Sequence, residues 1–494
     1  MNSMKQILTV CAAALVLVLP AAELMPVKVS GNKLVAGGKE LRLRGINWGW
    51  WHLKGTEYTE EDMKRQAGWG ANMLRLAMTY TDVIHPDGSW NEEAFKKVDE
   101  VVKWAKKHKQ YVILDLHVAP GGQDPAPYCD GGKNRIWKDP DKQEQYFDLW
   151  RGLAERYRNN PTVAAYEVMN EPCTQQADPR MLAELNRKVI AEIRKIDPDK
   201  VIVVSGDQWG NARDLKDAVK IDDPNILYTF HFYEGGSPED WLCNVGEGPG
   251  SAGTTDWVRF ELPVKTTNEV TNLSILLRSN KNSGTAWFDD IELVNQDGYV
   301  MQRLSFDRDS KPFWVERDPR NVGTYDSKVG HNKPGSLRLS GTGDYNGWVS
   351  PRFAVHPNQT YKVVGWMKLE NATGNSFIAA ALFGAGSTKI NTADLRGRIK
   401  PALDFAKKYN VPLWVGEFSA GRNSGPEGYQ AASVAERIRL FEENGISWTY
   451  WNYRETTGPD GMALVAQKRD GNGDFPINAP LLKVLTDGWK LNRR

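Results

Sequence analysis

Two glutamates stand out because each follows a short apolar run of the kind that forms a buried strand. Glu171 follows the run that begins at Val163, and Glu417 follows Leu413-Trp-Val-Gly. Two carboxyl groups side by side suit cleavage of a glycosidic bond, because one protonates the leaving oxygen while the other attacks the sugar or activates water. Their mutual repulsion keeps one of them protonated, which makes it the acid. The pair therefore predicts glycoside hydrolysis.

Further side chains that could bind a sugar lie at the ends of other apolar runs. They are Arg75, His117, Asn170, His231, Tyr233 and Trp451. Arg75 would keep the attacking carboxylate ionised, Asn170 could bond a sugar hydroxyl, and the flat ring of Trp451 could lie under a pyranose. Each of these residues alone is more often structural. Their joint occurrence at strand ends favours one common site.

The elements that must position these residues alternate between strand and helix. Apolar runs predict strands at Leu41–Ile46, Met73–Leu76, Tyr111–Leu116, Val163–Met169, Val201–Val204, Ile226–Phe230, Leu413–Val415 and Ser447–Trp451. Helical periodicity covers Glu60–Trp69, Glu92–Lys107, Asp141–Tyr157, Pro179–Ile196, Thr392–Tyr409 and Ala432–Asn444. Continuously apolar strands, each followed by a helix, predict an α/β (β/α)8 TIM barrel, whose chemistry lies at the carboxyl ends of its strands. Val27–Val35 is expected as a hairpin that closes the bottom of the barrel.

The strand and helix alternation breaks between the sixth and seventh strands. Residues 254–387 carry short alternating runs separated by Gly, Asn and Asp, which predicts an all-β jelly-roll sandwich inserted between strand 6 and helix 6. The catalytic barrel would then consist of residues 23–253 and 388–494. The two ends of such an insert must lie close together.

The ends of the chain and its composition limit the class of protein. Residues 1–22 combine a basic start, the apolar run Ile7–Leu19 and small residues, which predicts a signal peptide and a secreted or periplasmic protein. The 63 Lys and Arg nearly balance the 62 Asp and Glu, which argues against nucleic acid or, once the signal is removed, a membrane as partner. We expect a monomer. Cys129, Cys173 and Cys243 allow one disulfide whose pairing the sequence leaves open.

Other chemistries of the same barrel fit less well. A metal-dependent hydrolase would need several His and Asp ligands, including closely spaced histidines, and a Schiff-base aldolase would need a lysine at a strand end. The predicted strand ends carry neither pattern, and no Gly-rich phosphate loop follows the last two strands. We therefore expect no cofactor and no metal in the active site.

Seven motifs together resemble glycoside hydrolase family 5, the cellulase family. They are Leu43–Trp48, Asn72–Leu76, Leu114–His117, Glu167–Pro172, His231–Tyr233, Gly416–Phe418 and Trp448–Trp451. The resemblance implies a metal-free reaction that retains the anomeric configuration, with Glu171 as acid/base and Glu417 as nucleophile. It also places Arg75, His117, Asn170, His231, Tyr233 and Trp451 at the family's other active-site positions. Retention implies carboxyl groups about 5–5.5 Å apart.

Two segments depart from the simplest family members. The loop from Ala119 to Trp137 is long and is similar to the exo-β-1,3-glucanase branch as much as to the endo-cellulases. Gly284–Leu293 and Gly335–Ser340 resemble carbohydrate-binding modules of the family 4/9 type in reversed order, which a circularly permuted jelly roll would explain. The tryptophans of the insert are candidates for sugar stacking or for its core: Trp257, Trp287, Trp314, Trp348 and Trp366. Asp289 and Asp290 are candidates for a structural Ca²⁺.

These observations predict a secreted retaining endo-β-glycanase that acts on a β-linked polysaccharide or oligosaccharide. Aromatic residues expected to bind further sugar units are Trp48, Trp50, Trp51, Trp137 and Trp209. Three alternatives remain open from the sequence: a β-mannanase, an exo-β-1,3-glucanase, and a non-catalytic polysaccharide-binding protein on the same scaffold.

Overall fold

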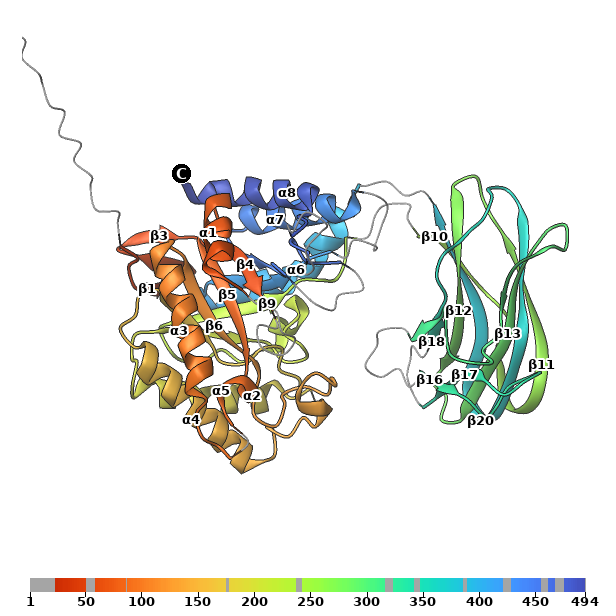
Figure 1. Cartoon of the computed structure of the whole chain (residues 1–494), viewed down its shortest axis with the longest axis horizontal. Coiled ribbons are helices and arrows are strands. Elements are labelled where there is room, and N and C mark those ends of the chain that lie inside the picture. The colour runs from red at the N-terminus through yellow and green to blue at the C-terminus, as the bar shows by residue number, and fades with distance from the viewer. Residues whose placement is uncertain are drawn as a thin grey trace, which may run out of the picture.

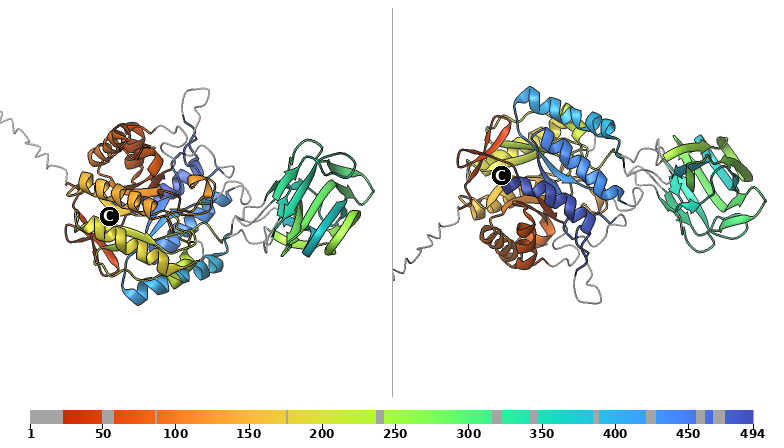
Figure 2. Two further views of the ribbon diagram at one scale, coloured as in Figure 1. Left: turned by 90° about the horizontal axis from the view of Figure 1, so that it is seen from below. Right: turned by 90° about the horizontal axis from the view of Figure 1, so that it is seen from above.

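The computed structural model describes residues 23–49, 58–85, 87–174, 177–236, 242–315, 323–341, 347–384, 389–420, 428–454, 461–466 and 475–493. The predicted signal peptide, Trp50, Trp51 and the predicted boundary after residue 387 lie outside these residues. Figures 1 and 2 show two bodies, an α/β barrel and an all-β sandwich beside it.

The barrel is a closed ring of parallel strands in the order β21-β22-β4-β5-β6-β7-β8-β9. Their bounds are β4 Arg44–Trp48, β5 Met73–Thr79, β6 Tyr111–Val118, β7 Val163–Glu167, β8 Val201–Ser205, β9 Ile226–His231, β21 Leu413–Phe418 and β22 Ser447–Tyr450. The predicted (β/α)8 barrel is confirmed. Each of the eight predicted apolar runs contributes one strand, with ends shifted by a few residues.

Helices surround the barrel (Figure 2) and follow the predicted ranges closely. Their bounds are α1 Glu60–Trp69, α2 Tyr80–Val83, α3 Glu92–Lys107, α4 Pro140–Tyr157, α5 Pro179–Arg194, α6 Thr392–Tyr409, α7 Tyr429–Glu443 and α8 Ala479–Trp489. The prediction that every strand is followed by a helix is wrong after β8, where only the 3₁₀ turn η2 (Ala212–Asp217) forms. No helix in the described ranges is long and apolar enough to cross a membrane.

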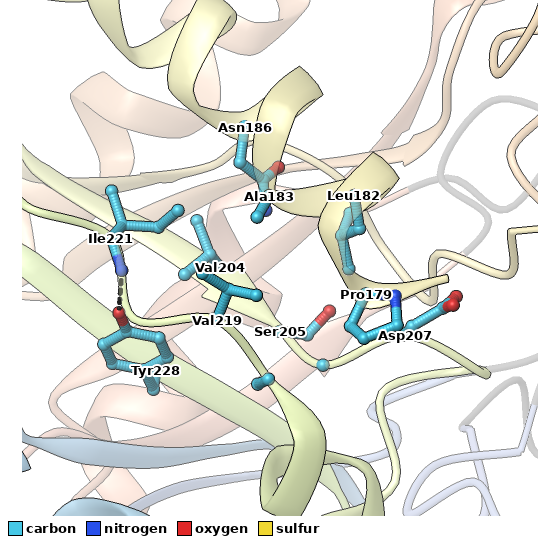
Figure 3. A pocket seen from close by; sticks show the side chains of 12 residues that line it. Pro179, Leu182, Ala183, Asn186, Val204, Ser205, Asp207, Val219, Ile221 and Tyr228 are labelled. Atoms are coloured by element: carbon cyan, nitrogen blue, oxygen red, sulfur yellow. Dashed lines mark hydrogen bonds between the residues drawn. The ribbon is translucent and has the colours of Figure 1, made fainter. Parts of the chain in front are cut away.

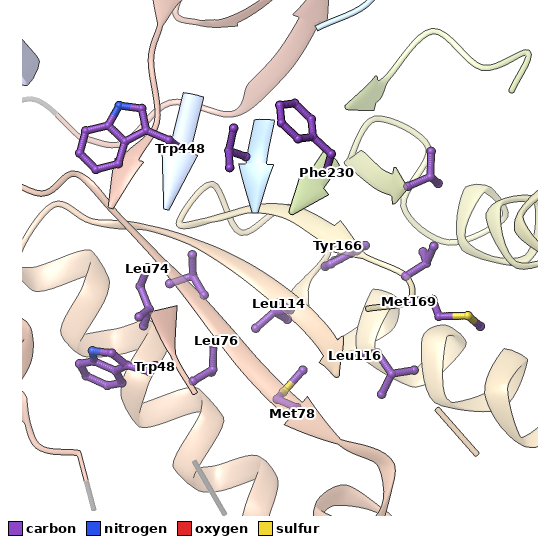
Figure 4. Packing of buried hydrophobic residues seen from close by; sticks show 14 of the residues in the cluster. Trp48, Leu74, Leu76, Met78, Leu114, Leu116, Tyr166, Met169, Phe230 and Trp448 are labelled. Atoms are coloured by element: carbon purple, nitrogen blue, oxygen red, sulfur yellow. The ribbon is translucent and has the colours of Figure 1, made fainter. Parts of the chain in front are cut away.

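Side chains alternate between the two faces of each barrel strand, and this alternation places the polar groups of the site. Leu74, Leu76, Leu114 and Leu116 point outward and pack against the helices, as Figure 4 shows. The residues between them point into the barrel. Met73 and Ile113 fill its lower part, and Arg75 and Asp115 lie above them.

A small antiparallel sheet covers the bottom of the barrel, as expected for Val27–Val35. It consists of β1 Val27–Ser30, β2 Lys33–Ala36 and a third strand, β3 Lys39–Leu41. Val27 and Leu34 pack against Met73 and Ile113 in the lower interior. This end is therefore filled with apolar side chains, and the polar groups lie at the other end.

The insert is a two-layered antiparallel structure whose strands lie between β9 and α6 in the chain. Its strands are β10 Leu242–Glu247, β11 Ser251–Lys265, β12 Val270–Asn280, β13 Thr285–Asn295, β14 Val300–Leu304, β15 Trp314–Val315, β16 Gly323–Asp326, β17 Ser336–Ser340, β18 Gly347–Val349, β19 Phe353–Ala354 and β20 Thr360–Gly384. The first half of β20 pairs with β11 and β13, and its second half pairs with β10 and β12. Apolar residues of both halves share one core. The strands begin at Leu242, before the boundary expected at Thr254.

We predict that Gly45→Ala destabilises the barrel. A Cβ at Gly45 would lie 2.1 Å from the carbonyl oxygen of Met73 on the neighbouring strand, so β4 and β5 would have to separate. We expect a loss of about 2 kcal/mol or more, measured as a lower midpoint of thermal unfolding. Gly397→Ala on α6 is the matched control, because nothing lies within 4 Å of its added Cβ and alanine favours a helix. Equal midpoints for the two variants would contradict the close approach of the strands.

Candidate active site

Arg75 is the centre of a hydrogen-bonded cluster inside the upper barrel, and its side chain has no exposed surface. Its guanidinium donates to both carboxylate oxygens of Glu167 at 2.6 and 3.0 Å and to Glu417 Oε1 at 2.6 Å. Asp115 Oδ2 lies 3.0 Å from Nη2. Asn47 and Asn170 accept from the same group at 3.1 and 2.9 Å. One buried cation thus binds carboxylates from three different strands.

Glu417, near the end of β21, lies in surroundings that favour its ionised form. Besides Arg75, the hydroxyl of Tyr233 donates to its Oε2 at 2.6 Å, and His231 Nδ1 lies 3.6 Å from the same oxygen. Burial alone would raise the pKa of Glu417, but His231 and Arg75, with smaller contributions from His117 and Tyr233, bring it well below its usual range. Glu417 is therefore a carboxylate over the ordinary range of pH.

Glu171 lies just beyond the end of β7, with a positive φ of 42°. Its Oε1 lies 2.7 Å from His231 Nδ1, and its Oε2 accepts from the Tyr128 hydroxyl at 3.2 Å. One polar atom each of Glu171, His231 and Glu417 lie within 4.8 Å of one another. The Glu171 side chain is 20% exposed, against 5% for Glu417. The two glutamates therefore face one another in different environments.

His117 and Trp451 form a stacked pair at the edge of this cluster. Their ring centroids are 5.4 Å apart with planes 12° from parallel, and His117 Nδ1 lies 2.8 Å from Asp115 Oδ2. Burial alone would lower the pKa of His117, but Asp115 raises it above its usual value. Gly49 lies so close to Trp451 that a Cβ there would be 2.7 Å from the indole. The Trp451 ring is thus fixed in place beside His117, at the edge of the Arg75 cluster.

The side-chain amide nitrogen of Asn170 is not used in hydrogen bonds within the described part of the protein. Its Oδ1 accepts from Arg75, which leaves its amide nitrogen as the donor that remains. That nitrogen is buried and has no hydrogen-bond partner among the described residues. A ligand oxygen at this position would satisfy it, as expected for a group that binds a sugar hydroxyl.

A comparison with protein families decides which family this arrangement belongs to. The family model described as cellulase, glycosyl hydrolase family 5, matches residues 34–280 and 363–456, which is more than half of the chain. The chain belongs to glycosyl hydrolase family 5.

Individual relatives of this family-5 chain agree with the assignment. Endoglucanase C of Acetivibrio thermocellus is 31% identical over 201 residues, which cover 38% of this chain and 57% of that protein. A beta-xylosidase of Phanerodontia chrysosporium is 31% identical over 248 residues, which cover 42% and 51%. The chain thus matches a little over half the length of these relatives. The crystal structure of a cellulose synthase subunit Z from Clostridioides difficile shares the fold, with a TM-score of 0.50, 16% identity and coverage of 90% and 99%.

The structure brings together the residues predicted from the family-5 motifs. His117, Asn170, Glu171, His231, Tyr233, Glu417 and Trp451 lie at or just beyond the carboxyl ends of their strands, and Arg75, within β5, reaches them from inside the barrel. Asp115 and Glu167 complete the Arg75 cluster and were not predicted as site residues. The sequence carries a signal for both residues. Asp115 is a charged residue two positions before His117 in a mostly apolar strand, so the two side chains share the inner face, and Glu167 is a charged residue at the end of the apolar strand β7.

The structure places two of the predicted aromatic subsites of this family-5 barrel in the protein interior. Trp48 has no exposed surface, donates to Gln66 Oε1 at 2.9 Å and stacks on Tyr58. Trp137 is 5% exposed and donates to Asn134 Oδ1 at 2.7 Å. Both indoles are core residues with satisfied N–H groups. Trp209 is half-buried, and its backbone N–H donates to the Pro172 carbonyl, so its role in binding sugar stays a prediction.

Several other predicted features have outcomes in the structure. Cys129 and Cys173 are buried and form no disulfide, while the side chain of Cys243 lies outside the described part.

Both Asp289 oxygens accept backbone N–H groups, and Asp290 Oδ2 accepts from Asn332 and contacts His331 Nδ1. Because these carboxylate oxygens already accept hydrogen bonds, the two aspartates do not fit a calcium site.

A cavity beside α5 is separate from the glutamate pair. Figure 3 shows its lining, which includes Leu182 and Ala183 of α5 and Val204 of β8. These residues lie on the helix side of the barrel wall, whereas Arg75 and Glu417 lie inside the barrel. The cavity therefore contributes nothing to the cluster of acidic residues.

We predict that Tyr233→Phe raises the pKa of Glu417. The variant loses the 2.6 Å hydrogen bond that stabilises the carboxylate, so a higher pH is needed to ionise it. We expect an upward shift of about one pH unit, measured by carbon NMR titration of labelled glutamate. Tyr450→Phe is the matched control, since it removes a buried tyrosine hydroxyl that donates to the Met462 carbonyl at 2.6 Å. An unchanged titration in Tyr233→Phe would contradict this role of the hydroxyl.

Proposed function

We propose that this chain is an exported, retaining endo-β-glycanase of the β-glucanase type. The observation that carries the proposal is the pair Glu171 and Glu417, whose carboxylates approach within 4.8 Å while only Glu417 lies against Arg75. That distance fits direct attack on the sugar, because an inverting pair needs a separation of about 6.5–9.5 Å to admit a water.

The proposed reaction has two displacements. Glu417 attacks the anomeric carbon while Glu171 gives its proton to the departing oxygen, which forms a glycosyl ester on Glu417 and releases the shortened chain. Glu171, now a carboxylate, takes a proton from water as the water attacks the same carbon and releases Glu417. Tyr233 and Arg75 stay bonded to the Glu417 oxygens on which the charge returns. Asn170, His117 and Trp451 are proposed to bind the sugar at this centre.

Substrate and location remain proposals of the same kind. Relatives named endoglucanase favour a β-linked glucan as substrate, and the sequence of residues 1–22 favours export. Another relative is a beta-xylosidase, so similar proteins differ in the sugar on which they act. Product lengths from β-1,4-, β-1,3- and mixed-linked glucans and from mannan separate the proposed activity from exo-acting and mannan-cleaving alternatives.

We predict that Glu171→Gln and Glu417→Gln each lower the rate of hydrolysis of a β-glucan by at least about 10²–10⁴-fold. Each variant keeps the shape of the side chain and removes the group that moves a proton or attacks carbon. Release of reducing ends measures the rate, and proton NMR of the first product shows its anomeric configuration. Glu234→Gln is the matched control, because Glu234 adjoins Tyr233 but is exposed and paired with Arg398. Near-normal rates in either test variant, or inverted product, would overturn the proposal.

We propose that the insert binds the same polysaccharide through the outer face of one layer. Trp257 of β11 and Trp366 of β20 are half-buried there, and the His331 ring contacts both, at 5.8 and 3.9 Å between centroids. Asn332 lies beside His331, is exposed and carries polar atoms suited to hydroxyl groups, while Asp290 holds the His331 ring and the Asn332 amide in place. Flat rings beside polar groups are the usual surface for a sugar ring.

We predict that Trp257→Ala lowers the affinity for soluble β-glucan by about tenfold. The comparison is made in the full chain carrying Glu417→Gln, so that the polysaccharide is not degraded, and retardation in glucan-containing gels measures the affinity. Trp314→Ala is the matched control, because Trp314 is half-exposed on β15, which pairs with β18, whereas the His331 ring contacts Trp257 and Trp366. Equal retardation of both variants would refute binding at Trp257.

A further inference from the structure

The long loop between β6 and α4 is fixed to the strand ends that carry His117 and Glu171. Gln123 in this loop is fully buried, and its side-chain amide donates to the carbonyls of His117 and Asn170 at 2.8 and 2.9 Å. The Gln123 carbonyl accepts from the backbone of Cys173 at 2.9 Å. The loop therefore keeps a fixed position beside Glu171.

Tyr128 of this loop contacts Glu171, the acid/base candidate, and Asp124 of the same loop contacts Tyr128. The Tyr128 hydroxyl lies 3.2 Å from Glu171 Oε2 and 3.1 Å from Asp124 Oδ2. Asp124 is fully buried, and its other oxygen accepts the backbone N–H of Ala126. A tyrosine hydroxyl has one proton, so Tyr128 can donate to only one of the two carboxyl groups at a time.

We propose that Tyr128, together with Asp124, is a positioning residue for Glu171 whose hydroxyl changes its acceptor during the reaction. While Glu171 is protonated, Tyr128 donates to the Asp124 carboxylate. Once Glu171 has given up its proton, the hydroxyl turns to the new Glu171 carboxylate and stabilises it. The interaction strengthens as the proton leaves, which is the condition for lowering the barrier rather than only binding substrate. The inference rests on the proposed acid/base function of Glu171.

The charges around Glu171 are consistent with this exchange. His231 Nδ1 lies 2.7 Å from Oε1 on the side opposite Tyr128's acceptor oxygen, and a Glu417 oxygen lies within 4.8 Å. Tyr233 is bonded to Glu417 and does not donate to Glu171 among the described contacts. Burial raises the pKa of Asp124, and the charge of Glu171 raises it further. The Tyr128 hydroxyl lies between these two carboxyl groups and contacts both.

The test compares substrates that differ in their need for acid catalysis. Phenyl β-cellobioside has a poor leaving group and needs a proton from Glu171, whereas dinitrophenyl β-cellobioside leaves without one. We expect Tyr128→Phe to lower kcat/KM about tenfold on the phenyl glycoside and less than about twofold on the dinitrophenyl glycoside. Tyr80→Phe is the matched control, because the Tyr80 hydroxyl also donates to an aspartate of this loop, Asp130, at 3.1 Å but does not reach Glu171.

A second variant tests Asp124 through the pH profile. Asp124→Asn removes the charge and keeps one oxygen for the Ala126 N–H, but its amide nitrogen cannot accept from Tyr128. The hydroxyl is then left to Glu171, and we expect the alkaline limit of kcat/KM on the phenyl glycoside to fall by about one pH unit. Equal losses on both glycosides in Tyr128→Phe, or an unmoved alkaline limit in Asp124→Asn, would overturn the inference while Glu171→Gln still discriminates between the glycosides. If Glu171→Gln itself does not discriminate, the proposed function fails, and the inference fails with it.

Discussion

The buried guanidinium of Arg75 is the interaction on which the rest of the site depends. Three carboxylates, those of Asp115, Glu167 and Glu417, converge on it from three strands inside the barrel. Charges of one sign cannot be buried together without a partner, because the loss of hydration costs several kcal/mol for each ion. Removing Arg75 would leave these carboxylates facing one another without a cation. The acidic residues on three strands therefore depend on one side chain.

The same cluster makes the two glutamates unequal. Glu417 is inside it, with Arg75 and Tyr233 as donors, and is kept ionised. Glu171 lies outside the Arg75 cluster, at a backbone position with positive φ. It is more exposed there and contacts His231 and Tyr128. Two residues of one type thus differ in role because one lies within reach of the buried cation and the other does not.

The sequence predicts those features that follow from period and local motif. Apolar runs that alternate with helical periods predict the barrel, and residues at the ends of those runs predict Arg75, Glu171 and Glu417 as parts of one site. Burial of aromatic residues depends on packing between distant elements, and for this reason Trp48, expected to contact sugar, is instead packed on Tyr58 and bonded to Gln66. Tyr128 reaches Glu171 through a loop fold fixed by Gln123, which no spacing in the sequence reveals.

The insert follows β9 closely, so the segment with His231 and Tyr233 must keep its position although the chain leaves the barrel just after it. Residues of α7 and α6 hold this segment in place. Buried Arg437 of α7 donates to the carbonyls of Tyr233 and Gly235 at 3.1 and 2.8 Å. Asp394, in the first turn of the helix that follows the insert, accepts the backbone N–H of Gly236 at 2.9 Å. The chain therefore leaves and re-enters the barrel at hydrogen-bonded points, and these bonds hold the segment that places Tyr233 against Glu417.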